Sequence, residues 1–339
     1  MSESTTQNYN HLKIHSQYSI CEGAIKIDDL KEFSKTNKIQ SLGLSDTTNL
    51  CGALEFAEKI SKVGTQPIIG TQINFKFNDT LGLLPLFALD EEGYKRIIKL
   101  SSFSFLNNDE LSEPLLDFNE LLEDTHGVAV LSGTVFGLFG QLFDKGKFTE
   151  IKDLYNKLKE KFGDRFYLEI QRHNDQNELS FEKFNLNKSL ELSIPLIATN
   201  EVFYLNKDMH EAHDALICIG RKTYINDKTR KRYSDQHYLK SNLEMAELFS
   251  DLPEALENNY NFPLRCNFRP SFSNPILPNI SSEKGGNADD ILKKDSLHGL
   301  KDKFHKVFGI KNNEIENNNI FLKYKDRLDH ELSIIIEMK

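Results

Sequence analysis

Short apolar segments alternate with amphipathic segments up to about residue 270, and this alternation restricts the fold more than any other feature of the chain. The segments between the apolar runs, for example 27–37, 50–63 and 149–162, carry apolar residues at helical spacing. Strands that alternate with helices predict a parallel sheet, either open or closed into a barrel. The expected strands are residues 11–15, 41–44, 67–75, 83–89, 128–131, 166–171 and 195–199.

The composition changes near residue 262, where FPLRCNFRPSFSNPILPNISSEKGGN combines prolines, a Gly-Gly pair and several Ser and Asn residues. Such a stretch is typical of a linker. We therefore expect a polar tail at residues 1–10 and a main domain at residues 11–265. A linker at residues 266–288 and a helical segment at residues 289–339 are expected to follow. The last predicted helix has an apolar stripe that includes Leu328 and Leu332 and ends at Lys339, so we expect a fragment of a longer protein.

Composition excludes several classes of protein. A formal charge of −9 excludes a chain whose whole surface is basic, as in a protein that wraps nucleic acid, although a local basic patch remains compatible with it. The first ten residues lack the pattern of a secretory signal, and no apolar stretch is long enough to cross a membrane. The 4 cysteines are scattered, so a zinc knuckle is excluded. We expect a cytoplasmic protein with no membrane contact.

The first predicted strand carries candidate site residues. Alternation places His11, Lys13 and His15 on one face of the strand. The two histidines are equally compatible with metal ligands and with polar residues at a strand end. Asp46 follows the strand 41–44, a position where (β/α) enzymes place chemistry, but a cap of the next helix, by Asp46 or a neighbouring threonine, is the favoured interpretation.

Two more candidates, His173 and Glu201, also follow predicted strands. Taken singly, a His or Glu in such a loop is more often solvated than catalytic. However, His15, Asp46, His173 and Glu201 all fall at comparable strand ends, so on a barrel they would converge. The basic run RKTYINDKTRKRY at 221–233 is compatible with a phosphate contact, and a solvated loop is its default interpretation.

Several stretches, in order along the chain, resemble the bacterial replicative DNA polymerase III alpha subunits. They are HLKIHSQYSICEG, SLGLSDTTNLCGALEFA, QPIIGTQINF, DRFYLEIQRH, PLIATNEVFYL, AHDALICIG, YLKSNLEMAELFSDLPEAL and DRLDHELSIIIEMK. The resemblance is to the N-terminal part of that family, a polymerase-and-histidinol-phosphatase (PHP) domain followed by the start of the palm. It implies an α/β fold: a distorted (β/α) barrel of PHP type at residues 11–265, and a mostly helical, incomplete and truncated palm segment at residues 289–339.

The resemblance also implies a degenerate metal site. A complete PHP site holds several metal ions and has 3′–5′ exonuclease activity. At the ligand positions of the family this chain has Lys13, His15, Asp46, Thr47, Gln72, Leu83, Thr134, His173, Glu201 and Phe203. Only His15, Asp46 and His173 are weak metal candidates, with Glu201 as a longer carboxylate, so we expect the PHP metals to be lost. Lys13 places a fixed cation at a ligand position and is expected to pair with Asp46 or Glu201.

For function, the resemblance implies a parent DNA-directed DNA polymerase that uses Mg²⁺ at palm aspartates beyond this chain. No catalytic residue is then expected in the chain itself. The implied partners are the proofreading exonuclease (epsilon) subunit, other subunits of the DNA polymerase III holoenzyme and, through the full-length protein, primer-template DNA. A free-standing PHP-type phosphoesterase or 3′–5′ exonuclease is the alternative, against which Lys13, Thr47 and Leu83 argue. An interaction protein without an attached polymerase is a third hypothesis.

Overall fold

A computed structural model describes residues 9–107, 113–230, 232–275, 287–310 and 312–338. The chain divides into two compact units, Met1–Phe272 and Ser273–Lys339, which are described separately. The strands are β1 (Lys13–Ile14), β2 (Ser41–Thr47), β3 (Gln66–Phe77), β4 (Thr80–Ala88), β5 (Leu116–Asp117), β6 (Val128–Leu131), β7 (Phe166–Ile170), β8 (Leu196–Ala198) and β9 (Glu201–Val202).

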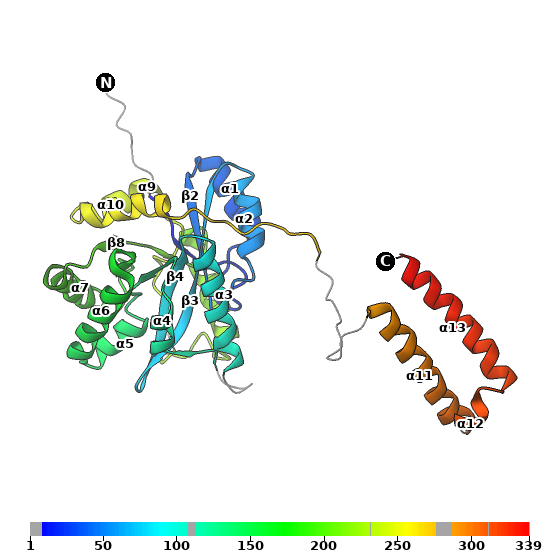
Figure 1. The fold of residues 1–339 in the computed structure, drawn as a ribbon. Coiled ribbons are helices and arrows are strands. Elements are labelled where there is room, and N and C mark those ends of the chain that lie inside the picture. Colours follow the sequence, from blue (N-terminus) through cyan, green and yellow to red (C-terminus); the bar gives the residue numbers. More distant parts are fainter. Residues whose placement is uncertain (1–8, 108–112, 231, 276–286, 311, 339) are drawn as a thin grey trace. The chain divides into compact units, whose positions relative to one another are not determined.

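The helices of the first unit cover the outside of the curled sheet (Figure 1). In that figure α1 and α2 lie on one flank, α5, α6 and α7 on another, and α9 and α10 at one end. They are α1 (Ile27–Asn37), α2 (Ala53–Ser61), α3 (Glu91–Leu106), α4 (Phe118–Glu123), α5 (Leu138–Asp144), α6 (Phe148–Phe162), α7 (Glu178–Leu192), α8 (His210–Gly220), α9 (Asn242–Leu248) and α10 (Pro253–Asn261), with short 3₁₀ helices η1 (Gly163–Arg165), η2 (Lys207–Met209) and η3 (Phe262–Arg265).

The sheet has the strand order β2-β3-β4-β6-β7-β8, with β5 paired to β3. β1 pairs in parallel with β9, and its chain also contacts β2, because the Gly43 N–H donates to the His11 carbonyl at 2.7 Å. A side chain at Gly43 would overlap the backbone of Leu12, so only glycine permits this close approach. β1 thereby connects its two-stranded sheet with β9 to the β2 edge of the curled main sheet. The expected distorted barrel of PHP type is confirmed.

The expectation of an all-parallel sheet is wrong for β4, which pairs antiparallel with both β3 and β6. The register pairs Phe77 with Thr80, which leaves a two-residue turn at Asn78 and Asp79. Asn78 has φ of 52°, the left-handed conformation that tight hairpins require and that Asn tolerates. β3 and β4 therefore form a hairpin with no helix between them. The remaining neighbours β2–β3, β6–β7 and β7–β8 are parallel, as expected.

An apolar cluster fills part of the barrel and receives residues from most strands. Its members come from the chain at β1, from β3, β4, β6, β7 and β8, and from η3, and they include Leu12, Ile68, Phe87, Leu131, Tyr167, Ile197 and Phe262. Side chains alternate along a strand, so residues two positions beyond these also point inward. Glu169 lies two residues after Tyr167 on β7 and is 2% exposed. The barrel interior thus continues from an apolar layer into a layer with buried charges.

The second unit consists of α11 (Ala288–Phe308), α12 (Asn312–Ile315) and α13 (Asn319–Met338). Phe304, Ile315 and Phe321 are its buried contacts. The predicted helices in this region are confirmed. Of the apolar stripe predicted on the last helix, Leu332 is buried, whereas Ile335 is 56% exposed. Among the described helices of both units, none is long and apolar enough to cross a membrane.

Candidate functional site

Lys13 is completely buried inside the barrel, between two carboxylates from different strands. The pairing of β1 with β9 places Lys13 beside Glu201, and its Nζ lies 3.4 Å from Glu201 Oε1. On the other side, Nζ lies 3.2 Å from Glu169 Oε1, and the Lys13 and Glu169 side chains are both 0% exposed. Glu169 Oε1 also accepts hydrogen bonds from Gln171 and Thr199. A charged lysine is tolerated in the protein interior only where opposite charges lie close to it.

Glu201 is the point where the contacts of the site converge. Its Oε1 lies 3.0 Å from His15 Nε2 and accepts a hydrogen bond from Gln72 Nε2 at 2.7 Å. Burial alone would raise the pKa of Glu201, but Lys13 and the donors from His15 and Gln72 hold it well below 4.5. For His15, burial lowers the pKa, but the hydrogen bond to Glu201 and the charge of Glu22 outweigh it, and the pKa lies above 6.5. Glu201 is therefore a carboxylate already matched by cationic and amide donors.

Asp46 has a different set of partners. Its carboxylate accepts hydrogen bonds from the Ser16 N–H at 2.7 Å, from the Ser16 hydroxyl and from the Ser19 hydroxyl at 2.8 Å. Burial outweighs these donors and raises the pKa of Asp46 above 3.8. The favoured interpretation of Asp46 or a neighbouring threonine as a helix cap is wrong, because α2 begins only at Ala53, with Gly52 as its N-cap. Ser19 Oγ, 3.2 Å from His15 Nδ1, connects Asp46 to the rest of the site.

His173 completes the group of sequence candidates. The Glu201 N–H donates to His173 Nε2 at 3.2 Å, and His173 Nδ1 lies 3.3 Å from Glu178 Oε1. Burial and the neighbouring His237 lower the pKa of His173 well below 6.5. The contacts through Glu201 and Ser19 therefore join all five candidate residues, which are Lys13, His15, Asp46, His173 and Glu201.

A cavity of about 120 Å³ lies beside this network. Its lining includes His15 and Glu201 together with residues at positions where the resemblance expects a metal ligand and the chain lacks one. The lining residues are His15, Glu22, Gln72, Leu83, Thr134, Phe136, Gly137, Glu201, Phe203, Arg221 and Tyr233. Gln72, Leu83, Thr134 and Phe203, which were assigned to ligand positions from sequence, thus face one common space.

Comparison with known proteins fits this geometry. Residues 11–173 match the family model of the PHP domain. This stretch of the chain is therefore similar to a PHP domain. It is 38% identical over 330 residues to the DNA polymerase III subunit alpha of Rickettsia conorii, across 97% of this chain and 28% of that protein. With the corresponding protein of Caulobacter vibrioides it shares 34% identity over 351 residues, across 100% of this chain and 30% of the relative.

These relatives confirm the resemblance to DNA polymerase III alpha subunits that the motifs indicated. The chain spans less than a third of the length of these two relatives. Among solved structures, an amidohydrolase from Chromobacterium violaceum matches with a TM-score of 0.40 and 10% identity, over 57% of this chain and 87% of that chain.

The residues of this PHP domain do not fit a hydrolytic metal cluster. The Lys13 ammonium stands between Glu169 and Glu201, where it would repel a divalent ion. The oxygens of Asp46 are engaged by hydroxyl and amide donors rather than open to a cavity. Phe203 offers no lone pair, and its ring lies 4.5 Å from that of His15. We therefore assign no reaction step to a metal in this cavity.

A second group, His173, Asp175 and His237, brings ligand atoms within 4.8 Å of one another. The two imidazole rings stack in parallel, with centroids 4.1 Å apart and an interplanar angle of 3°. Parallel rings direct their nitrogen lone pairs side by side rather than toward one point. Both nitrogens of His173 already face Glu201 and Glu178, and His237 Nε2 lies 3.1 Å from Asp175 Oδ2. These contacts describe a closed hydrogen-bonded network rather than an open metal site.

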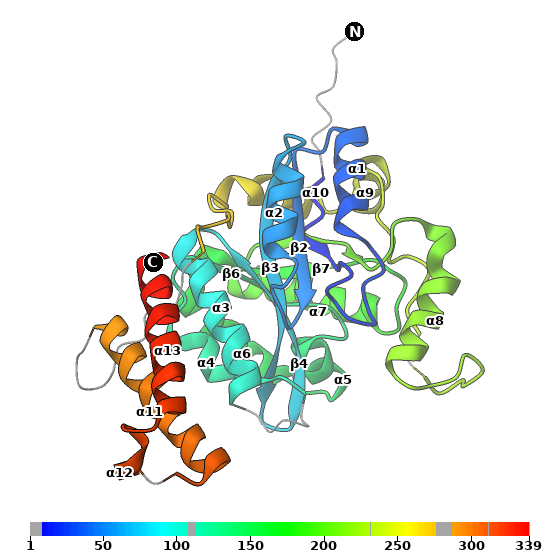
Figure 2. The same ribbon diagram turned by 90° about the vertical axis from the view of Figure 1, so that its right-hand side faces the viewer.

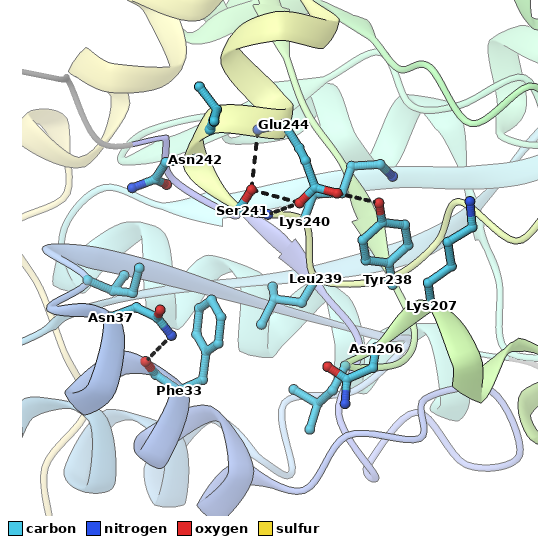
Figure 3. A pocket seen from close by; sticks show the side chains of 13 residues that line it. Phe33, Asn37, Asn206, Lys207, Tyr238, Leu239, Lys240, Ser241, Asn242 and Glu244 are labelled. Carbon is cyan, nitrogen blue, oxygen red and sulfur yellow. Dashed lines mark hydrogen bonds between the residues drawn. The ribbon is translucent and has the colours of Figure 1, made fainter.

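A wider hollow, of about 490 Å³, lies elsewhere on the first unit, between α1 and the segment that leads into α9 (Figure 3). Phe33 and Leu239 form part of its wall, and the labelled polar residues surround them. Its charged groups are engaged: Glu244 accepts from the Tyr238 hydroxyl at 2.6 Å, and Lys207 pairs with Asp235 at 3.1 Å. Burial lowers the pKa of Lys240, which also lines the hollow, to about 8, and its ammonium donates to Asn200 Oδ1 at 3.1 Å.

Sequence reasoning missed two carboxylates of the site. Glu169 is the second partner of Lys13, and its only sequence signal is a charged residue inside the apolar strand FYLEI. Glu22 lines the cavity, and its Oε2 accepts a hydrogen bond from the Thr47 hydroxyl. Lys13 was expected to pair with Asp46 or Glu201; the pair with Glu201 is present, and Glu169 takes the place of Asp46.

Proposed function

We propose that this chain is the N-terminal part of a replicative DNA polymerase III alpha subunit, and that its PHP barrel is a scaffold rather than a nuclease. The observation that carries the proposal is the Lys13 ammonium, buried between Glu169 and Glu201. In this position the lysine supplies the positive charge that a metal ion would otherwise bring to two buried carboxylates. The barrel keeps its fold without the ions that hydrolysis requires.

The parent protein would be a DNA-directed DNA polymerase, with Mg²⁺ bound by palm aspartates that this chain does not contain. Residues 289–339 would begin the palm, and residues 266–288 would link it to the barrel. Primer-template DNA, other subunits of the DNA polymerase III holoenzyme and a separate proofreading exonuclease, the epsilon subunit, would be the partners. The parent protein would be located in the cytoplasm. Support comes from relatives named DNA polymerase III subunit alpha, with 31% to 38% identity.

A metal and nuclease assay tests the scaffold role. We expect the purified chain, after incubation with Zn²⁺ or Mn²⁺ and gel filtration, to retain far less than one metal ion per molecule by atomic emission. We also expect no removal of nucleotides from 3′-labelled single-stranded DNA. The His15→Ala variant is the control for contaminating nuclease. Stoichiometric metal together with hydrolysis that this variant abolishes would support a PHP phosphoesterase or exonuclease instead.

The assignment to a polymerase has its own test, which is to sequence the gene beyond the Lys339 codon. We expect the reading frame to continue into a palm with paired aspartates. A stop codon in an intact gene would leave a scaffold module without polymerase chemistry, and would refute this part of the proposal while leaving the role of Lys13 intact.

A further inference from the structure

Glu169 is a buried carboxylate to which no sequence motif gives a role. It lies within β7, among the central strands that the helices surround (Figure 2), and its side chain is 0% exposed. Oε1 accepts hydrogen bonds from Gln171 and Thr199, whereas Oε2 has no hydrogen-bond partner within the described part of the chain. A buried carboxylate with such an oxygen needs a positive charge close by.

The Lys13 ammonium is held in place by charge rather than by directed hydrogen bonds. Its Nζ lies 3.2 Å from Glu169 Oε1 and 3.4 Å from Glu201 Oε1, yet it forms no hydrogen bond with any residue that the structure describes. The shorter distance alone would allow a hydrogen bond, so the ammonium group is not oriented for one. The position of Nζ is therefore defined by two carboxylates that attract a cation without regard to its shape.

Two carboxylates that face one point are also ligands that a divalent ion such as Mn²⁺ prefers, with water at its remaining positions. Oxygen ligands of hard divalent ions lie about 2.0–2.6 Å from the metal, so each carboxylate would move inward by about 1 Å around an ion at the position of Nζ. The side chain of Lys13 fills this position, and its charge repels a second cation. Ammonium and metal therefore exclude each other here.

We infer that Glu169 and Glu201 define one cation position inside the barrel, which Lys13 occupies in this chain and which takes a divalent cation when the lysine side chain is removed. The inference rests on the proposed scaffold function, and it adds Glu169, which is outside the ligand positions that the resemblance implies. Asp46 takes no part, because its oxygens accept hydrogen bonds from Ser16 and Ser19.

Manganese binding to the Lys13→Ala variant of the full chain tests the inference. Free Mn²⁺ is measured by electron paramagnetic resonance during a titration, and circular dichroism follows the fold. The substitution removes the ammonium and leaves space for an ion with water ligands. We expect the variant to bind about one Mn²⁺ per molecule, at least about tenfold more tightly than the unaltered chain binds this ion.

Further variants separate the effects of ligand, space and charge. Adding Glu169→Gln to Lys13→Ala removes the proposed ligand, so Mn²⁺ affinity should return to within about twofold of that of the unaltered chain. Lys13→Met removes the charge but fills the space, so it should bind Mn²⁺ more weakly than Lys13→Ala does. Propylammonium matches the atoms that Lys13→Ala removes, and it should compete with Mn²⁺ for this variant.

The inference is overturned if folded Lys13→Ala binds Mn²⁺ no more tightly than the unaltered chain, or if its binding survives Glu169→Gln. Lys13→Ala is also informative if it unfolds in the absence of added ions. Recovery of the native circular dichroism spectrum with Mn²⁺ or propylammonium would then support the inference, and failure of both to restore it would overturn the inference.

The unaltered chain separates this inference from the scaffold role. Stoichiometric metal with nuclease activity in the unaltered chain would refute both, because Lys13 would then not exclude the ion. A negative result confined to the Lys13→Ala variants would refute only the shared cation position and would leave the scaffold role intact.

Discussion

Replacement of Lys13 by methionine is the most direct test of the charge arrangement in the barrel. Methionine has a similar length and volume but no charge, so the substitution removes the cation with little change in packing. It leaves the carboxylates of Glu169 and Glu201 facing each other in the interior, where the lysine ammonium now lies 3.2 and 3.4 Å from them. Removal of one partner of a buried pair costs about 3–5 kcal/mol. We expect the free energy of unfolding to fall by about 4 kcal/mol at pH 7.

The effect should depend on pH in a defined direction. In the unaltered chain the folded pKa of Glu201 lies well below 4.5, so its contribution to stability is complete above the unfolded pKa and is lost as pH falls through the folded value. In Lys13→Met the burial of Glu201 is no longer offset by that cation, so its pKa rises and the carboxyl takes up a proton at mildly acidic pH. The difference between the two proteins should therefore be smaller at pH 5 than at pH 7.

The measurement is urea unfolding followed by far-ultraviolet circular dichroism, since the chain has 0 Trp residues for fluorescence. Lys62→Met is the matched control, because Lys62 is 63% exposed and pairs with Glu58 only at the surface. It should cost less than about 1 kcal/mol. Adding Glu169→Gln and Glu201→Gln to Lys13→Met should recover most of the loss. The reasoning is refuted if Lys13→Met behaves like Lys62→Met, or if its loss is equal at pH 5 and pH 7.

Two further substitutions test the surroundings of the site. Gln72→Glu replaces the amide that donates to Glu201 at 2.7 Å with a second carboxylate. Thermal melts should show that the free energy of unfolding falls by roughly 2–3 kcal/mol at pH 7, and by less at pH 5. An equal loss of stability at both pH values would contradict this prediction. Gly43→Ala places a Cβ 2.6 Å from the Leu12 Cα and should lower the free energy of unfolding by about 3 kcal/mol or more. The control Gly299→Ala in α11 has open space around its Cβ and should stabilise its helix by about 0.5–1 kcal/mol. Similar melting curves for the two variants would refute the packing of β1 on β2.

Much of the barrel was predictable because its elements carry strong local signals. The strand expected at 128–131 is β6 with the same bounds, and the helix expected at 27–37 is α1. The direction of β4 was missed because hydrophobic periodicity reports that a strand exists but not which neighbour it pairs with. The direction of β4 follows from the length of its connection to β3. Only Asn78 and Asp79 connect the two strands, and two residues are too few for a crossover between parallel strands.

The candidate site was predictable only as a set of positions at strand ends. His15, Asp46, His173 and Glu201 are each joined to the network by contacts that their spacing in sequence does not encode. The expected partner of Lys13 was a carboxylate at such a strand end. Glu169, however, lies within β7, and only the curl of the sheet brings it to Lys13.

The same geometry explains how two carboxylates are accommodated inside the barrel. Two inward carboxylates, Glu169 and Glu201, come from strands far apart in sequence, and each needs a positive partner in the interior. Lys13 on β1 reaches both carboxylates. The pairing of β1 with β9 places it beside Glu201, and its Nζ also lies 3.2 Å from Glu169 Oε1. The cation is then covalently part of the chain and cannot dissociate from the two carboxylates. Glu169 and Glu201 therefore balance the buried charge of Lys13, a structural role that is independent of any hydrolytic role for the cavity.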